Sequence, residues 1–81
     1  MANIRLHILS PEGPLVEREV SLVTLPGMLA PFTVLPGHAP LATALLSGDI
    51  RYVAEGREER FRIREGFVEV KDNEVSACVD I

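Results

Sequence analysis

The sequence predicts a small all-β domain, an antiparallel β-sandwich or flattened barrel of about eight to ten short strands. Apolar and polar residues alternate along most of the chain, which is typical of strands with one buried face. Turn-forming Gly, Pro, Asp and Asn recur about every ten residues between these segments. With 81 residues the chain supports one hydrophobic core, so residues 1–81 are expected to form a single domain.

The first half of the chain reads as strands separated by one clear turn. Apolar side chains alternate with polar ones over residues 4–8, and the Ser-Pro-Glu-Gly-Pro segment at 10–14 ends that pattern. Strand-type residues resume over 15–25, but their alternation is disturbed at 17–19. We expect a β-bulge there, because an extra residue would restore the phase that buries Val20, Leu22 and their neighbours.

The second half alternates more regularly. Turns are expected at Glu55-Gly56, Glu65-Gly66 and Asp72-Asn73, and Gly48 opens the first of the strands between them. The alternation predicts these inward-facing residues: Ile50, Tyr52, Ala54, Phe61, Ile63, Val75, Ala77, Val79 and Ile81.

The middle of the chain, residues 25–41, departs from this pattern. Four of the six prolines fall here among apolar neighbours, so the segment cannot be a central strand throughout. Its apolar residues 28–31 either fold under the sheet as a satellite core or form an exposed tip that docks on another protein. The following residues 41–46 have a helix-forming composition, and taken alone they predict one or two helical turns.

Charge and cysteine content exclude several kinds of partner and site. Eight basic residues against twelve acidic ones give a net charge of −4, which disfavours nucleic-acid binding. The single cysteine, Cys78, cannot form an internal disulfide, and together with His7 and His38 it offers too few ligands for a structural zinc site. The chain has no apolar run of the roughly 18 residues that span a membrane.

No combination of residues predicts catalysis. His38 is interpreted as a structural or interface hydrogen-bonding group, His7 as a solvated side chain, and Cys78 as an unreactive residue on the face opposite the valines. The chain lacks a GxxxxGK[ST] motif and any grouped nucleophile, base and orienting residue. We therefore expect no catalytic residues, no metal or cofactor site and no small-molecule substrate.

Arginines are concentrated at residues 51–64, which leaves a second function open. Glutamates are interspersed among them, so cross-strand ion pairs on a solvated face explain them well. The alternative is an OB-like nucleic-acid-binding β-barrel that uses these arginines with Tyr52 and Phe61. Asp49, which follows Gly48, is expected to shape a turn.

A family resemblance rests on Pro26-Gly27, on Leu35-Pro-Gly-His-Ala-Pro-Leu41 and on Gly48-Asp-Ile50. With these motifs the whole chain resembles the N-terminal β-sandwich domain of the epsilon subunit of F-type ATP synthases, called delta in mitochondria. The resemblance implies a noncatalytic central-stalk subunit that binds the gamma subunit and the c-ring and couples proton-driven rotation to ATP synthesis. It also implies indirect membrane association, at the cytoplasmic face of the bacterial inner membrane.

Two segments correspond to partner-binding segments of that family. The resemblance implies a c-ring-facing loop formed by Gly27, Met28, Leu29, Ala30 and Pro31. It implies a gamma-facing segment formed by His38, Ala39, Pro40, Leu41 and Thr43. It also makes residues 41–46 extended, against their helical propensity.

The chain departs from the family in two places. Ala30 and Pro31 stand where the family often has Gly and an acidic residue, so the ring contact is expected to be more apolar. Family members usually continue into two α-helices that restrain ATP hydrolysis, and the sequence stops at Ile81, where that hairpin would begin. The resemblance therefore implies the sandwich without the inhibitory helices and without the ATP-binding residues that some relatives carry on them.

Overall fold

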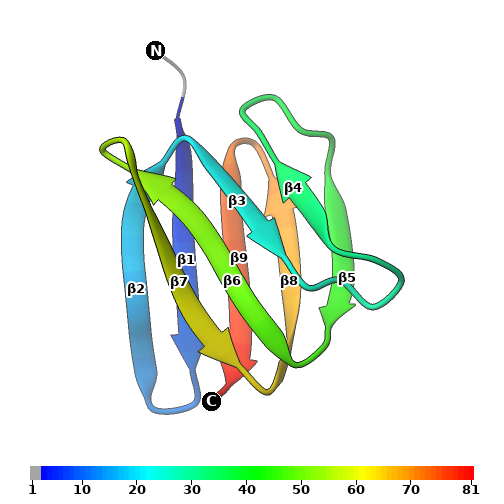
Figure 1. The fold of residues 1–81 in the computed structure, drawn as a ribbon. Helices are drawn as coiled ribbons and strands as arrows, with labels where there is room; N and C mark the ends of the chain where they lie inside the picture. Colours follow the sequence, from blue (N-terminus) through cyan, green and yellow to red (C-terminus); the bar gives the residue numbers. More distant parts are fainter. Residues whose placement is uncertain (1–2) are drawn as a thin grey trace.

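The computed structural model describes residues 3–81, which form two β-sheets packed face to face (Figure 1). The first two residues of the predicted 1–81 domain lie outside this range. One sheet has five strands in the order β2-β1-β9-β8-β5, and the other has four in the order β4-β3-β6-β7. The prediction of an all-β sandwich is confirmed.

The described residues contain nine strands, within the predicted number. Their bounds are β1 Ile4–Ser10, β2 Gly13–Val20, β3 Leu22–Leu25, β4 Phe32–Val34, β5 Leu41–Leu45, β6 Gly48–Ala54, β7 Arg57–Ile63, β8 Glu65–Lys71 and β9 Glu74–Asp80.

The first two strands form a hairpin whose irregularity differs from the prediction. The turn is shorter than residues 10–14, because β2 already begins at Gly13. The register shifts where Ile8 pairs with Val16 and Leu9 pairs with Pro14, which leaves Leu15 as the extra residue. The expected bulge at 17–19 is therefore wrong in position, and those residues pair regularly. The phase changes instead at Ser21, a bend between β2 and β3. Val23 and Leu25 are therefore buried, and the predicted burial of Leu22 is wrong because it is only half-buried.

One strand pair is parallel, which the antiparallel prediction did not include. β1 pairs with β9 in parallel, and every other pair of strands is antiparallel. A parallel pair needs a long connection, and here the connection is the whole domain between its first and last strands. The two ends of the fold are thereby joined in the middle of one sheet.

Two tight hairpins form where turn residues predicted them. Glu55 and Gly56 have φ angles of 53° and 75°, and Asp72 and Asn73 have φ angles of 53° and 61°. Two successive positive φ values define the type I′ turn, whose twist matches that of the flanking strands. These turns connect β6 with β7 and β8 with β9.

The expected turn at Glu65-Gly66 is wrong. Both residues belong to β8, and the chain passes from one sheet to the other at Arg64 alone. Gly66 serves a close approach between strands, since a Cβ there would lie 2.6 Å from the carbonyl oxygen of Cys78. A glycine within a strand often marks such an approach rather than a turn.

Replacing Gly66 by alanine should destabilise the fold by about 1–3 kcal/mol, because the backbone of β9 must shift to accept the methyl group. Glu65→Ala, at the exposed neighbouring position, is the control and should stay within about 0.5 kcal/mol of the wild type. Urea unfolding of both variants measures the difference. Equal midpoints would show that the strands can separate at Gly66 without cost.

The core lies between the two sheets and contains the alternating residues that the sequence predicted, with one exception. Ile50, Tyr52, Ala54, Ile63, Val75, Ala77 and Val79 are all buried, and Phe61 packs against them partly buried. Ile81 follows the end of β9 and is 59% exposed, so its predicted place in the core is wrong.

Residues 41–46 do not form helical turns. Leu41–Leu45 is β5, an edge strand paired with β8, so tertiary pairing overrides helical propensity here and the extended form implied by the family resemblance is correct. Residues 3–81 include no helix long and apolar enough to cross a membrane.

Candidate docking surface

The tip loop, residues 27–31, connects β3 with β4 and projects beside the end of β5 (Figure 1). Backbone contacts hold its base: Met28 N–H donates to the carbonyl of Ala44 at 3.0 Å, and Leu46 N–H donates to that of Pro26 at 2.8 Å. Gly27 forms an isolated bridge with Leu45. The loop conformation is therefore fixed without burying the loop's own apolar side chains.

Those side chains are on the surface. Leu29 is 98% exposed and Met28 is 56% exposed, and Ala30 and Pro31 are exposed as well. They do not fold under the sheet, so the satellite-core alternative is wrong for residues 28–31. Only Gly27 is buried, and a Cβ there would lie 2.6 Å from the carbonyl oxygen of Ala30. Of the five residues predicted to face a c-ring, four form one exposed apolar tip.

The predicted gamma-facing segment begins in the loop between β4 and β5. Gly37 N–H donates to the Asn73 side-chain oxygen at 2.7 Å, which ties this loop to the β8–β9 turn. His38 N–H donates to the carbonyl of Leu35 at 3.0 Å, and its ring Nδ1 lies 2.7 Å from the carbonyl oxygen of Ala39. His38 is thus held by contacts within its own loop.

The segment does not present all its members to one surface. Ala39 and Pro40 are exposed, whereas Leu41 and Thr43 are half-buried on β5. These two share the core-facing side with their register partners Val70 and Val68. The outward positions of β5 are Ala42 and Ala44, which the sequence did not single out.

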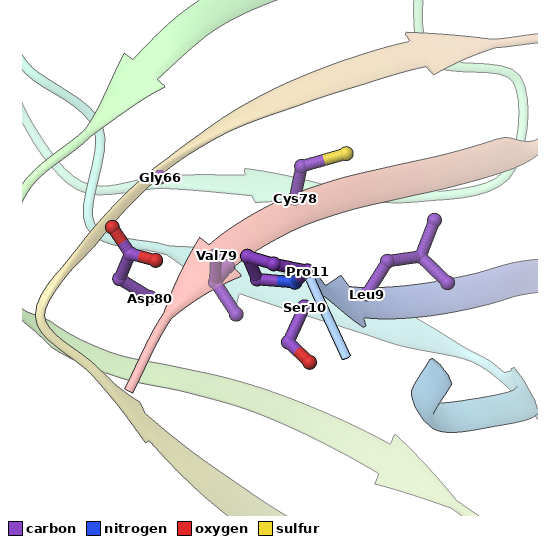
Figure 2. A pocket seen from close by; sticks show the side chains of 7 residues that line it. All are labelled: Leu9, Ser10, Pro11, Gly66, Cys78, Val79 and Asp80. Carbon is purple, nitrogen blue, oxygen red and sulfur yellow. The ribbon is translucent and has the colours of Figure 1, made fainter. Parts of the chain in front are cut away.

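An apolar row crosses the outer face of the five-stranded sheet. We define it by four register partners on adjacent strands: Leu9 pairs with Cys78, Cys78 with Phe67, and Phe67 with Ala44. Phe67 is 52% exposed although it is a large aromatic residue. Figure 2 shows Leu9 and Cys78 projecting to the same side of the sheet, opposite to Val79.

The apolar row leads into a groove that reaches the tip loop. Met28, Leu46, Ala44, Phe67 and Cys78 line this open groove of about 490 Å³, and so do the charged residues Arg64, Glu65 and Asp80. A second hollow of about 310 Å³, shown in Figure 2, adjoins it at Gly66 and Cys78. The tip loop, the groove and the apolar row therefore form one continuous surface that is mainly apolar. Large exposed apolar patches are candidates for contacts with other proteins.

Sequence reasoning missed Phe67, Leu46 and Leu9 as members of this surface. A signal was present for Phe67, because it has the opposite parity to buried Val68 and Val70 and must therefore point outward. An aromatic residue on the solvent face of a strand is a candidate for a partner contact. The row itself could not be derived, since it depends on the parallel pairing of β1 with β9.

The arginine-rich strand β7 forms the expected ion pairs, although with a different main partner. Arg60 and Arg62 approach the two carboxylate oxygens of Asp49 at 3.7 and 3.6 Å, and Arg18 pairs with Glu59 at 3.3 Å. Asp49 lies within β6, so its predicted role in a turn is wrong. Its carboxylate balances the positive charges of Arg60 and Arg62 on the neighbouring strand β7.

His7 and Cys78 are the other two residues that the sequence singled out as chemical groups. His7 is half-buried, with its Nε2 3.9 Å from a carboxylate oxygen of Glu74, and Cys78 is exposed. Among residues 3–81 no polar or charged residue is buried. The same range contains no group of three His, Cys, Asp or Glu residues arranged to hold a metal ion.

Fold and surface together define a class of protein, a small β-sandwich with a preformed tip loop and a mainly apolar groove on its surface. Residues 3–81 match the family described as the β-sandwich domain of the ATP synthase delta/epsilon chain. The chain belongs to this family. The match agrees with the family resemblance of the sequence and gives no support to the OB-like nucleic-acid-binding alternative.

Individual relatives agree with this assignment. The chain is 41% identical over 75 residues to the ATP synthase epsilon chain of Desulfitobacterium hafniense (strain Y51), which covers 93% of this chain and 57% of that protein. It is 40% identical over 73 residues to that of Carboxydothermus hydrogenoformans, covering 90% and 54%. The chain thus spans little more than half the length of these relatives.

Solved structures share the fold. A chain in the Euglena gracilis mitochondrial ATP synthase, determined as OSCP/F1/c-ring, superposes with a TM-score of 0.89 at 24% identity, covering 98% of this chain and 51% of that one. A chain in the central stalk and c-ring of the Tetrahymena thermophila enzyme gives a TM-score of 0.80 at 15% identity, covering 99% and 65%.

Proposed function

We propose that this chain is a noncatalytic subunit of the central stalk of a rotary F-type ATP synthase, where it binds the gamma subunit and the c-ring. It transmits proton-driven rotation to the catalytic head and carries no active site of its own. The observation that carries this proposal is the continuous, mainly apolar surface of tip loop, groove and apolar row, on a fold that belongs to the delta/epsilon family.

Two parts of this surface suit two partners. The tip loop projects at the end of β5 and is rigid at its base, so little entropy is lost when it docks on the c-ring. The apolar row and the outward positions of β5 present a flatter surface, which we assign to the gamma subunit together with His38, Ala39 and Pro40. Leu41 and Thr43 act from the core-facing side of β5 by positioning that edge strand.

Membrane association is then indirect. The chain is held at the cytoplasmic face of the bacterial inner membrane by the complex and not by insertion of its own residues. Purified chain should bind purified gamma subunit at micromolar concentration and should show no ATPase activity alone. A folded preparation that fails to bind gamma in analytical ultracentrifugation would refute the proposal.

Replacing Phe67 by serine should weaken gamma binding about three- to tenfold, because docking would bury the exposed half of a ring whose full burial contributes about 1.5–3 kcal/mol. The free chain should lose about 1 kcal/mol of stability, since the other half of the ring is already buried there. Glu17→Ser, on the outer face of β2 at the opposite edge of the same sheet, is the control and should bind almost normally. Equal binding by the two variants in isothermal titration calorimetry would remove the apolar row from the interface.

A further inference from the structure

The outer face of the four-stranded sheet carries a row of aligned polar residues. Thr33 pairs with Thr24, Thr24 with Arg51, and Arg51 with Arg60, so the row crosses all four strands. The two threonine hydroxyl oxygens lie 2.9 Å apart, which fixes one end of the row. At the other end two arginines face each other directly, and like charges opposite one another destabilise a strand pair.

Neighbouring carboxylates neutralise only part of this charge. Arg60 lies 3.7 Å from an Asp49 oxygen and 3.8 Å from a Glu58 oxygen, and Asp49 is shared with Arg62 at 3.6 Å. Within residues 3–81, Arg51 makes no ion pair. Arg51 is thus an exposed residue without an ion pair among the described residues, and it lies opposite a second arginine, Arg60.

This arginine pair lies beside the tip loop. Arg51 and Arg60 line a depression of about 240 Å³ together with Thr24, Pro26, Pro31 and the acidic residue Asp49. Pro31 is the last residue of the tip loop and Pro26 precedes its first. A partner that receives the tip loop therefore comes within reach of the two guanidinium groups.

We propose that Arg51 and Arg60 bind a carboxylate on the c-ring surface that receives the tip loop. The inference rests on the proposed function for its partner and adds the chemistry of the contact. Arginine binds carboxylates through two parallel hydrogen bonds, and a shared carboxylate would relieve the repulsion between the pair. The tip loop lacks a charged residue of its own, so the arginine pair supplies the polar contact beside it.

The composition of this face favours a single carboxylate over a polyanion. Asp49 and Glu58 lie among the arginines, and the whole chain carries a net charge of −4. An anionic membrane or a nucleic acid would meet these negative charges as well as the arginines. Asp49 lines the depression too, but Asp49 and Glu58 supply two carboxylates against the three arginines Arg51, Arg60 and Arg62. One further carboxylate from a protein surface balances the remaining positive charge.

The test uses the chain, purified gamma subunit and purified c-ring in detergent, with Arg51→Gln as the variant. Arg5→Gln removes the same charge from exposed Arg5 on the five-stranded sheet and is the control. We expect Arg51→Gln to weaken assembly at least about tenfold and to reduce its salt dependence, while Arg5→Gln assembles normally. The free Arg51→Gln chain should be as stable as the wild type or more stable, since repulsion with Arg60 is relieved.

Each other result overturns the inference in a distinct way. Equal assembly of Arg51→Gln and wild type would remove the arginine pair from the contact while leaving the proposed function standing. Failure of the wild-type chain to assemble would refute the proposed function itself. A loss of stability in the free Arg51→Gln chain would show that Arg51 stabilises the fold and is not held in place for a partner. Arg51-dependent binding of the chain to phosphatidylglycerol vesicles would show that the arginine pair binds a lipid headgroup and not a protein carboxylate.

Discussion

Leu29→Asp should abolish stable attachment of the chain to the c-ring while leaving its fold intact. The side chain of Leu29 is 98% exposed, so its replacement removes no contact within the domain. At a docked apolar tip, however, the aspartate carboxylate would have to be desolvated without a partner, which costs several kcal/mol. A desolvation penalty of about 3 kcal/mol corresponds to at least a hundredfold loss of affinity. Sedimentation of the chain with gamma and c-ring should show this loss.

The control for this variant is Leu29→Met, which keeps an apolar side chain of similar volume and should retain binding. Unfolding curves of both variants should lie within about 0.5 kcal/mol of the wild type. The backbone bonds of Met28 and Leu46 hold the loop base and are unaffected by either change. Unfolding of Leu29→Asp would instead mean that the loop packs as a satellite core, and unchanged attachment would mean that the tip contacts no partner.

Leu6→Ala should have the largest effect on stability, a loss of about 3–5 kcal/mol. Leu6 is completely buried on β1, between register partners on β2 and β9, where strands from both ends of the chain meet. Small domains have a total stability of about 5–15 kcal/mol, so the variant should be near the limit of folding. Its urea midpoint should fall steeply with little change in the slope of the transition.

Leu15→Ala provides the matched control for the same chemical change. Leu15 is 37% exposed at the irregular position of the β1–β2 hairpin and is outside the core cluster. Its replacement should cost much less than that of Leu6. Similar losses for the two variants would contradict the division between core and surface described above.

Local patterns were sufficient to predict much of this fold. Alternation correctly assigned Ile50, Tyr52 and Ala54 to the core, because a strand with one buried face imposes a period of two. Positive-φ turns formed at Glu55-Gly56 and Asp72-Asn73, where residues that tolerate such angles stand. These features depend on neighbours in sequence, and for that reason they could be derived from it.

Features that depend on distant contacts could not be derived in this way. Gly66 looked like a turn residue, but it is a strand residue because the carbonyl of Cys78 lies close to it. Leu41–Leu45 has helical propensity, but pairing with β8 makes it a strand. Asp49 looked like part of a turn, but it lies across from Arg62, with which it forms an ion pair.

The candidate docking surface was predicted only in part. Proline and glycine among apolar residues correctly drew attention to the tip loop, whose exposure the structure then established. The row through Leu9, Cys78 and Phe67 requires three strand registers at once, one of them parallel, and no local pattern contains that information. The predicted partner roles of both segments remain predictions.

Hydrogen exchange of the chain bound to gamma and the c-ring tests the central claim most directly. Docking should slow exchange in two regions: the tip loop at residues 27–31, and the β5–β8 edge that carries Ala44 and Phe67. The outer strand β2, far from both, should exchange as in the free chain. Protection confined to β2, or absent from both the tip loop and the β5–β8 edge, would contradict the account.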